Sequence, residues 1–291
     1  MKIVVLGATG LVGSHVRSAG LAAGHDVVGT TRSASSPGLR QLELGDQAAT
    51  LAFLAAEQPE VVIHAAGWTW VDGCEADPER SRLHNFEIPS EVARWCHRHN
   101  ARFVGYSTSY VFDGSKGGYG ETDPVAPVNR YGRDKADAEK AVLDITGGAA
   151  LVPRLICVWG AELARKNFVY QVLAAAHGDK PLRLPSDQCG NPTWAGDIAH
   201  WSLCLLQNSA AGIWHLAGAR PEMNRVEWAE CILKGLAARE PGTRLAIEPQ
   251  TTKELGQKAL RPLLAGMSNA KIQALSPRTC RAPSDIPDDI R

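Results

Sequence analysis

The sequence predicts an α/β fold, a Rossmann-type doubly wound parallel sheet with a smaller α/β lobe attached. Three observations predict it. A glycine-rich turn at residues 7–13 follows a wholly apolar strand. Apolar, β-rich runs then alternate with helical stretches up to about residue 160, which is typical of a parallel sheet covered by helices on both faces. After Gly160 the alternation gives way to helices separated by short extended pieces.

The elements of the first part follow from local patterns. Strands are expected where apolar and β-branched residues run together, and helices where longer stretches end at Gly24 or before Pro59. The expected strands are Lys2–Leu6, Asp26–Thr31, Val61–Ala66, Arg102–Ser107 and Ala150–Val158. The expected helices are Leu11–Ala23, Gln47–Gln58, Pro78–Asn100 and Tyr131–Leu143.

After residue 160, the order of expected helices and strands changes. Its expected helices are Asn167–His177, Asp197–Gln207 and Arg225–Ala238, and its extended pieces are Pro181–Leu184 and Gly212–Leu216. We therefore divide the chain into a first domain over residues 1–160, a lobe over 161–275 and an irregular tail over 276–291. In an alternative division, part of residues 195–220 returns to the first domain.

Composition excludes several classes of partner. Basic and acidic residues balance at 31 each among 291 residues, without a basic stripe, so neither nucleic acid nor an anionic membrane surface has electrostatic support. No apolar run approaches the roughly 20 residues of a membrane span, and the N-terminus does not resemble a signal peptide. The seven cysteines are scattered and form no C-x-x-C pair. We expect a reduced, cytoplasmic protein without a catalytic metal.

The turn contains Gly7, Gly10 and Gly13 in a G-x-x-G-x-x-G spacing between the first strand and the first helix. Glycines there permit a tight turn, a close approach of the backbone to a pyrophosphate and close packing of helix on strand. The helix N-terminus offers free N–H groups to the phosphates. The first domain is therefore predicted to bind a dinucleotide; the alternative is a turn with only a structural role.

The end of the second strand indicates which dinucleotide. NAD-selective sites place an acidic residue there, whereas this strand ends in Thr31-Arg32-Ser33. A guanidinium suits a 2′-phosphate, so we predict NADP(H). The alternative for Arg32 is a solvated surface charge.

Two further strand ends carry candidate residues. Ala65, Ala66 and Gly67 end the third strand in small side chains, as a cofactor lying across strand ends requires. His64 is interpreted as a packed core histidine rather than a catalytic one. Thr108 follows the fourth strand and is predicted to bind the substrate carbonyl, the alternative being a hydroxyl that satisfies strand-end backbone groups.

Tyr131 and Lys135 form a Y-x-x-x-K pair at the start of a helix. The spacing of four places both side chains on one face of the helix. A neighbouring ammonium and a nicotinamide cation stabilise phenolate, so we expect the pKa of Tyr131 to be lowered. In a reduction, Tyr131 would donate a proton to the carbonyl oxygen while Lys135 holds the ribose hydroxyls.

The flanking motifs resemble those of the dTDP-4-dehydrorhamnose reductase family, within the extended short-chain dehydrogenases. Ser107–Gly114 reads S-T-S-Y-V-F-D-G, close to the family's S-T-D-Y-V-F-D-G, and Asp187–Thr193 matches its D-Q-x-G-x-P-T. A V-D-x-x-E…N segment over residues 71–85, the run from Tyr119 to Pro124, Glu139 after the Y-x-x-x-K pair, and Arg261-Pro262 agree as well.

The resemblance implies an NADPH-dependent reduction of the 4-keto group of a nucleotide-linked 6-deoxyhexose, with Thr108, Tyr131 and Lys135 as the catalytic triad. It also implies that the second part is a substrate-binding lobe and that Asn191 contacts the substrate. The implied cofactor contacts are Gly10, Leu11, Val12, Leu44, Ala65, Ala66, Gly67 and Tyr106.

The sequence departs from the family at three places expected near the sugar. Ser109 replaces an aspartate, Cys157 replaces a tryptophan, and Trp68 and Trp70 add bulk beside the third strand. We expect a different or modified keto-sugar nucleotide as substrate. Trp95, Trp201 and Trp228 are expected in the core.

Two other functions remain open at this point. One is a sugar-nucleotide epimerase or dehydratase on the same fold. The other is a non-catalytic, NADP-binding regulatory subunit. A small-molecule substrate and a homodimer are the expected partners.

Overall fold

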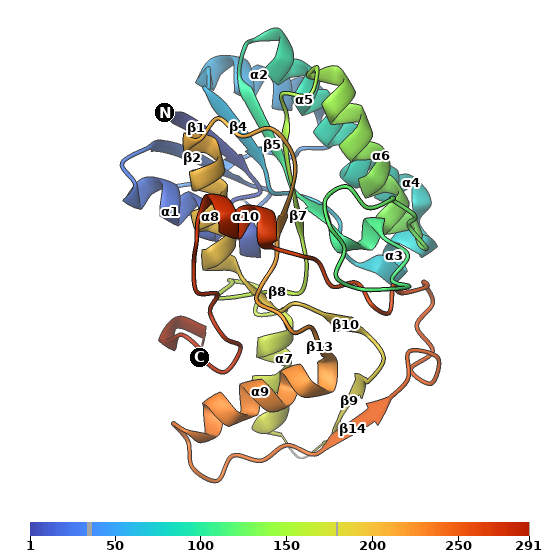
Figure 1. The fold of residues 1–291 in the computed structure, drawn as a ribbon. Helices are drawn as coiled ribbons and strands as arrows, with labels where there is room; N and C mark the ends of the chain where they lie inside the picture. The colour runs from blue at the N-terminus through green and yellow to red at the C-terminus, as the bar shows by residue number, and fades with distance from the viewer. Residues whose placement is uncertain (34–36, 179, 291) are drawn as a thin grey trace.

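The computed structural model describes residues 1–33, 37–178 and 180–290. Its main sheet has eight strands within these residues, in the order β3-β2-β1-β4-β5-β7-β12, with β6 also paired to β7 (Figure 1). All pairings in it are parallel, which confirms the doubly wound fold. The strands are β1 (Lys2–Leu6), β2 (Asp26–Thr31), β3 (Arg40–Gln41), β4 (Val61–His64), β5 (Arg102–Gly105), β6 (Ser107–Thr108), β7 (Leu151–Leu155) and β12 (Gly212–Leu216).

The strand order reverses beside β1. The chain winds outward from β1 to β2 and β3, and then returns to place β4 on the other side of β1. Loops that follow neighbouring strands on the two sides of such a point diverge and leave a crevice at the carboxyl ends of the strands. This crevice positions the site described below.

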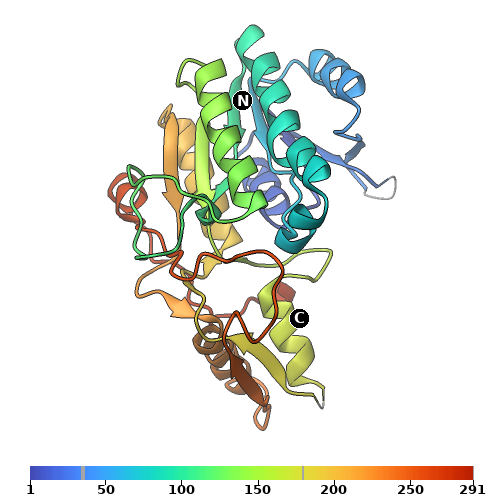
Figure 2. The ribbon, with the colours of Figure 1, turned by 90° about the vertical axis from the view of Figure 1, so that its right-hand side faces the viewer.

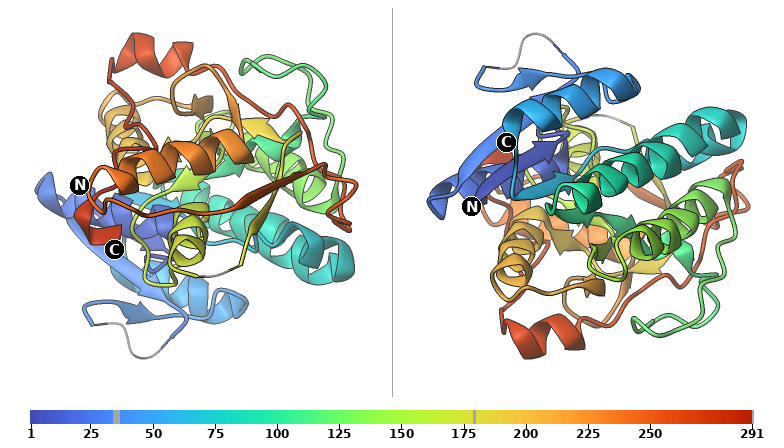
Figure 3. Two further views of the ribbon diagram at one scale, coloured as in Figure 1. Left: turned by 90° about the horizontal axis from the view of Figure 1, so that it is seen from below. Right: turned by 90° about the horizontal axis from the view of Figure 1, so that it is seen from above.

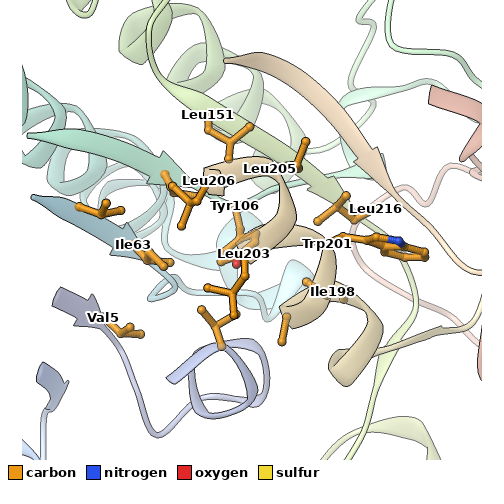
Figure 4. Close-up of a cluster of buried hydrophobic side chains, with 14 of the residues drawn as sticks. Val5, Ile63, Tyr106, Leu151, Ile198, Trp201, Leu203, Leu205, Leu206 and Leu216 are labelled. Atoms are coloured by element: carbon orange, nitrogen blue, oxygen red, sulfur yellow. The ribbon is translucent and has the colours of Figure 1, made fainter. Parts of the chain in front are cut away.

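Helices cover both faces of the sheet (Figure 3). On one face, α1 (Leu11–Ala22) packs against α8 (Ala195–Gln207), and on the other lie α2 (Gln47–Glu57), α5 (Ile88–Arg98) and α6 (Arg130–Ile145). One hydrophobic core lies between the sheet and the helices α1 and α8. Figure 4 shows part of this core, where Trp201 of α8 is buried beside strand side chains such as Leu216. Residues 195–216 therefore pack with the first part of the chain.

A smaller group of helices and strands lies below the main sheet (Figures 1 and 2) and encloses its own hydrophobic core. Here α7 (Phe168–Ala176) and α9 (Arg225–Ala237) pack together beside the parallel pair β9 (Leu182–Pro185) and β14 (Ile247–Gln250). Trp159 and Trp228 are buried in this core together with Ile286 and Ile290 of the tail. Trp95, like Trp201 and Trp228, is buried, as predicted.

The remaining elements are short and lie mainly in connections. They are α3 (Val71–Ala76), α4 (Pro78–Arg82), the π-helical turn η1 (Leu83–Glu87), η2 (Ser109–Val111), β8 (Val158–Trp159), β10 (Cys189–Gly190), β11 (Thr193–Trp194), β13 (Met223–Asn224), α10 (Ala270–Leu275) and η3 (Asp288–Ile290). Among the described residues, no helix is long and apolar enough to cross a bilayer.

Two predicted elements are interrupted. The helix expected over residues 78–100 contains the π-helical turn η1, because Pro89 lacks the N–H that would continue the regular ladder. The strand expected over residues 150–158 stops at Leu155. Cys157 follows with a φ of 46°, a left-handed conformation that no strand continues through.

Candidate active site

Two hollows lie along the carboxyl edge of the sheet and share Gly10 and the run 65–67. We name them the large cavity, of about 550 Å³, and the arginine groove, of about 500 Å³. Both volumes fall in the range of small-molecule sites. The arginine groove contains Gly7, Thr30, Thr31, Arg32, Leu44, Trp68, Arg80 and His84. The large cavity contains Leu11, Val12, Tyr106, Thr108, Ser109, Tyr131, Lys135, Cys157, Gln188 and Arg225.

The glycine turn lies where the two hollows meet. Gly7 has a φ of +84°, and a Cβ there would approach the backbone nitrogen of Ala66 to 2.9 Å. A Cβ on Gly13 would come within 2.3 Å of the Gly7 carbonyl oxygen. The absence of a side chain at Gly7 and Gly13 therefore allows α1 to pack closely against the turn, as the sequence predicts. Gly13 itself lines neither hollow.

The N-terminus of α1 is free to bind an anion. Its N-cap, Gly10, has no side chain to accept from the first N–H groups, and the first turn contains no acidic residue. The N–H groups of this turn therefore face the shared part of the two hollows with their positive dipole end.

Thr108, Tyr131 and Lys135 come together in the large cavity from two elements. Thr108 ends β6, and its hydroxyl accepts a hydrogen bond from the Tyr110 N–H at 3.2 Å. Tyr131 and Lys135 lie on the first turns of α6, which begins after Asn129, whose side chain accepts from the Gly132 N–H at 2.8 Å.

The acid–base properties of Tyr131 differ from the expectation. Burial raises the pKa of Tyr131 above its ordinary value, and the hydrogen bond to Thr108 offsets only part of this rise. Lys135 does not contribute to lowering it, and its ammonium group donates to the carbonyl oxygen of Tyr106. The predicted lowering of this pKa is therefore wrong for the chain by itself, and Tyr131 carries its proton at neutral pH.

Lys135 is itself perturbed. Burial lowers the pKa of Lys135 to about 8, and the Glu139 carboxylate one turn away opposes this shift. Glu139 is already engaged by Arg154, whose guanidinium donates to both carboxylate oxygens at 2.8 and 2.7 Å, with both side chains buried. The ion pair with Arg154 holds the Glu139 carboxylate in place, buried, one turn from Lys135.

Ser109 and Cys157, two of the departures from the family pattern, both line the large cavity. Ser109 is 1% exposed, and its hydroxyl has no hydrogen-bond partner among the described residues. A buried hydroxyl in this state is available to a bound ligand. Burial also raises the pKa of the Cys157 thiol, so it stays protonated at neutral pH.

Three other predicted residues lie elsewhere. Trp68 lines the arginine groove and not the large cavity, while Trp70 is 64% exposed and lines neither. Asn191 is fully buried outside both hollows, where its side chain accepts from the Met267 N–H at 2.8 Å. His64 is also buried, and burial lowers its pKa to about 3, which agrees with a neutral core histidine.

Several cavity residues escaped the sequence reasoning. Gln188 belongs to the D-Q-x-G-x-P-T motif, whereas no motif or spacing in the sequence indicates Glu162, Lys166 or Arg225 as cavity residues. Arg225 lies 4.7 Å from the Trp228 ring centroid and begins α9, so its position depends on how the lobe packs against the sheet. A charged residue at a helix start gives no sequence signal for this placement.

Comparison with known proteins places the chain among reductases. The family model described as "RmlD substrate binding domain" matches residues 1–282. A probable low-salt glycan biosynthesis reductase of Haloferax volcanii, Agl14, is 34% identical over 272 residues, which cover 90% of this chain and 88% of that protein. The dTDP-4-dehydrorhamnose reductase of Burkholderia thailandensis is 33% identical over 289 residues, 94% of this chain and 92% of that protein.

The fold agrees with these relationships. The crystal structure of a dTDP-4-dehydrorhamnose reductase from Clostridium acetobutylicum superposes with a TM-score of 0.86 at 26% sequence identity. The superposition covers 97% of this chain and 96% of that one, so both the sheet and the lobe are shared.

Proposed function

Because this chain belongs to the dTDP-4-dehydrorhamnose reductase family, we propose that it is an NADPH-dependent ketoreductase acting on a nucleotide-linked 4-keto-6-deoxy sugar. One observation carries the proposal. Thr108, Tyr131 and Lys135 line the same cavity as the glycine turn at the N-terminus of α1. A substrate carbonyl and a reduced nicotinamide can therefore be placed side by side in one cavity.

The proton transfer follows from the state of Tyr131. A general acid must carry its proton when the substrate arrives, and burial keeps the Tyr131 phenol protonated at neutral pH. When bound, NADPH supplies the hydride. Tyr131 donates its proton to the carbonyl oxygen, Thr108 orients that oxygen, and Lys135 stabilises the phenolate left on Tyr131.

The residues around the turn fit NADP(H). The free N–H groups of α1 suit the pyrophosphate, and Gly7, where a Cβ would clash with Ala66, keeps the turn close to the end of β4. Arg32 is exposed in the arginine groove and forms no ion pair with any described residue, so its guanidinium is available to a 2′-phosphate. Gly10, Leu11, Val12, Arg32 and Leu44 all line one or both of the two hollows, which supports their proposed binding roles.

The proposed substrate difference rests on Ser109 and Cys157. Both line the large cavity beside the triad, whereas Trp68 and Trp70 do not. A serine hydroxyl and a neutral thiol replace a carboxylate and an indole there, so the sugar's hydrogen-bonding groups meet different partners. We propose a sugar whose hydroxyl pattern or substitution differs from that of dTDP-4-dehydrorhamnose.

A spectrophotometric assay tests this function. Purified protein is incubated with NADPH and a panel of nucleotide-linked 4-keto sugars, including dTDP-4-dehydrorhamnose. Stoichiometric loss of NADPH absorbance supports a reductase. Conversion of a sugar without loss of NADPH indicates an epimerase or dehydratase instead. Efficient reduction of dTDP-4-dehydrorhamnose would refute the substrate difference alone.

The proposal also covers the division into domains, the cellular location and the oligomeric state. Two hydrophobic clusters on the faces of the sheet support a dinucleotide-binding part, in which residues 195–216 pack, and a third cluster supports a substrate lobe. Seven free cysteines suit a reducing, cytoplasmic location. Light scattering of the purified protein tests the proposed homodimer.

A further inference from the structure

The arginine groove contains a second arginine in addition to Arg32. Arg80 lies on α4 and lines the groove together with Trp68. Its guanidinium carbon is 4.4 Å from the centroid of the Trp68 ring, a cation–π contact. Nothing in the sequence pattern singles out this residue, because it precedes the motif asparagine Asn85 in an ordinary polar helix.

Arg80 is not neutralised by an acidic side chain. Among the described residues it forms no ion pair, whereas Arg82 on the same helix pairs with both Asp134 and Asp137. A guanidinium that stacks one face on an indole keeps its N–H groups, which lie in its plane, free for an oxygen ligand. Arg80 therefore brings to the groove a guanidinium that no acidic side chain among the described residues neutralises.

Trp68 is a firm support for this guanidinium. Its backbone N–H donates to the Asn85 side-chain oxygen at 3.1 Å, and its carbonyl accepts from the Asn85 amide at 3.0 Å. The same carbonyl accepts from the Cys74 thiol at 3.3 Å. Because Asn85 and Cys74 are buried, these contacts fix the backbone that carries the indole.

Arg80 and Arg32 act on the same part of the groove. His84 lies there too, and after burial the charge of Arg80 is the largest cause that lowers the pKa of His84, with Arg32 contributing in the same direction. Glu43 opposes this shift and is the acidic side chain among the described residues of the groove; its carboxylate accepts from the Gly45 N–H at 3.2 Å. Two guanidinium groups thus line one groove in which Glu43 is the single acidic side chain among the described residues.

We propose that Arg80, held over Trp68, joins Arg32 in binding a phosphate monoester, which is the 2′-phosphate of the dinucleotide under the proposed function. Two guanidinium groups match the charge and the acceptor oxygens of a phosphate monoester far better than one. Trp68 is in this assignment a positioning residue for the cofactor and does not contact the sugar substrate.

The experiment compares two probes that differ in the 2′-phosphate. Adenosine 2′,5′-bisphosphate and 5′-AMP are titrated into the full chain by calorimetry. We expect the wild-type protein to bind the bisphosphate more tightly. Arg80→Gln should weaken bisphosphate binding roughly tenfold while leaving 5′-AMP within about twofold, since only the first ligand carries the group that Arg80 contacts.

Matched variants separate this role from general effects. Arg98→Gln removes an exposed arginine that lines neither hollow and should leave both affinities unchanged. Trp68→Leu should weaken bisphosphate binding, and Trp68→Phe should restore most of it, because a phenyl ring keeps the cation–π contact. Unchanged 5′-AMP binding shows that each variant is folded.

The outcomes distinguish this inference from the proposed function. If Arg80→Gln leaves the ratio of the two affinities unchanged while Arg32→Gln abolishes it, Arg32 acts alone and the inference is wrong. If the wild-type protein binds both probes equally, the inference and the NADP preference fail together, and an NADH-dependent reductase remains. If it binds neither, the dinucleotide site itself is refuted.

Discussion

At the residue scale, the chemistry of the site depends on how burial shifts the pKa values of Tyr131 and Lys135. Burial raises the pKa of Tyr131 and lowers the pKa of Lys135, so both shifts favour the neutral form. A neutral phenol is the form that a reduction consumes. The ammonium of Lys135 gains its role only once negative charge develops on Tyr131, because opposite charges within about 4–6 Å stabilise each other.

Tyr131→Phe is predicted to abolish most of the reductase activity without affecting cofactor binding. The variant loses the proton donor, and general acid catalysis is worth roughly 10²–10⁴-fold in rate. Steady-state kinetics should show the fall in kcat, and calorimetry should show unchanged binding of adenosine 2′,5′-bisphosphate. Tyr170→Phe, in the core of the lobe, is the matched control. Retained activity in Tyr131→Phe would favour a regulatory subunit.

Lys135 predicts a pH dependence of stability. Its pKa is lowered from 10.5 to about 8 in the folded chain, so between these values the unfolded state binds more protons. The free energy of unfolding should therefore rise with pH across this window, by roughly 1–3 kcal/mol relative to Lys135→Met. Urea unfolding of both proteins at pH 7.5 and 10.5 measures this difference. Parallel pH curves for the two proteins would contradict the assigned pKa.

At the scale of elements, the site is assembled by contacts between segments far apart in the chain. Asp72 on α3 accepts from the Ala259 N–H at 2.9 Å and from the Arg261 guanidinium at 2.9 Å. These bonds hold the loop that brings Pro262 to the wall of the large cavity. In the Arg261-Pro262 pair, Arg261 therefore anchors the loop to Asp72, and Pro262 forms part of the cavity wall.

Asp72→Asn is predicted to loosen this loop. We expect a several-fold rise in KM for the keto sugar with little change in KM for NADPH, since Pro262 lines the large cavity and not the arginine groove. Initial-rate measurements with each substrate varied in turn provide the test. Equal effects on both constants would show that the loop does not act on the sugar alone.

The hydrogen bonds that Asp72 accepts from Ala259 and Arg261 are expected to weaken in acid. Burial by itself raises the pKa of Asp72, but the bonds from Ala259 and Arg261 outweigh it and leave the pKa below its usual value. Its stabilising effect is therefore present above the unfolded pKa of about 3.9 and is lost as pH falls through the lower folded value. Unfolding measured below pH 4 should show a steeper loss for wild type than for Asp72→Asn.

The sequence predicts the elements of the sheet better than the walls of the site. The strands, the glycine turn and the Tyr131–Lys135 pair follow from local patterns, and the structure bears out those elements. Trp68 and Arg80 could not be placed, because the direction of a side chain after a strand end depends on the loop's tertiary bonds to Asn85. Asn191 was assigned to the substrate from a motif, although its side chain bonds the backbone of Met267.

At the scale of the whole molecule, the two cores are linked by repeated crossings. The chain enters the lobe after Gly160, returns to the sheet for α8 and β12, and goes back to the lobe for α9 and β14. The tail also joins both parts: Arg278 donates to Asp197 of α8 at 2.6 Å, while Ile286 is buried in the lobe.

A fragment of residues 1–160 is predicted not to fold. It lacks α8 and β12, so the apolar surface that Trp201 and Leu205 cover would face water. Calorimetry should show no cooperative thermal transition for it, and no binding of adenosine 2′,5′-bisphosphate. Joining residues 195–220 to the fragment through a glycine–serine linker should restore part of both. A cooperative transition in the short fragment alone would contradict this account.

The repeated crossings between the two cores constrain how this molecule can diversify. A recombination event at residue 160 would exchange the lobe together with the α8 cover and the β12 edge of the sheet, two surfaces fitted to the parent's own strands. New sugar preferences are then reached more readily by point substitutions around Ser109 and Cys157 than by shuffling halves of genes. Chimeras intended to transfer specificity need breakpoints on both sides of residues 195–216.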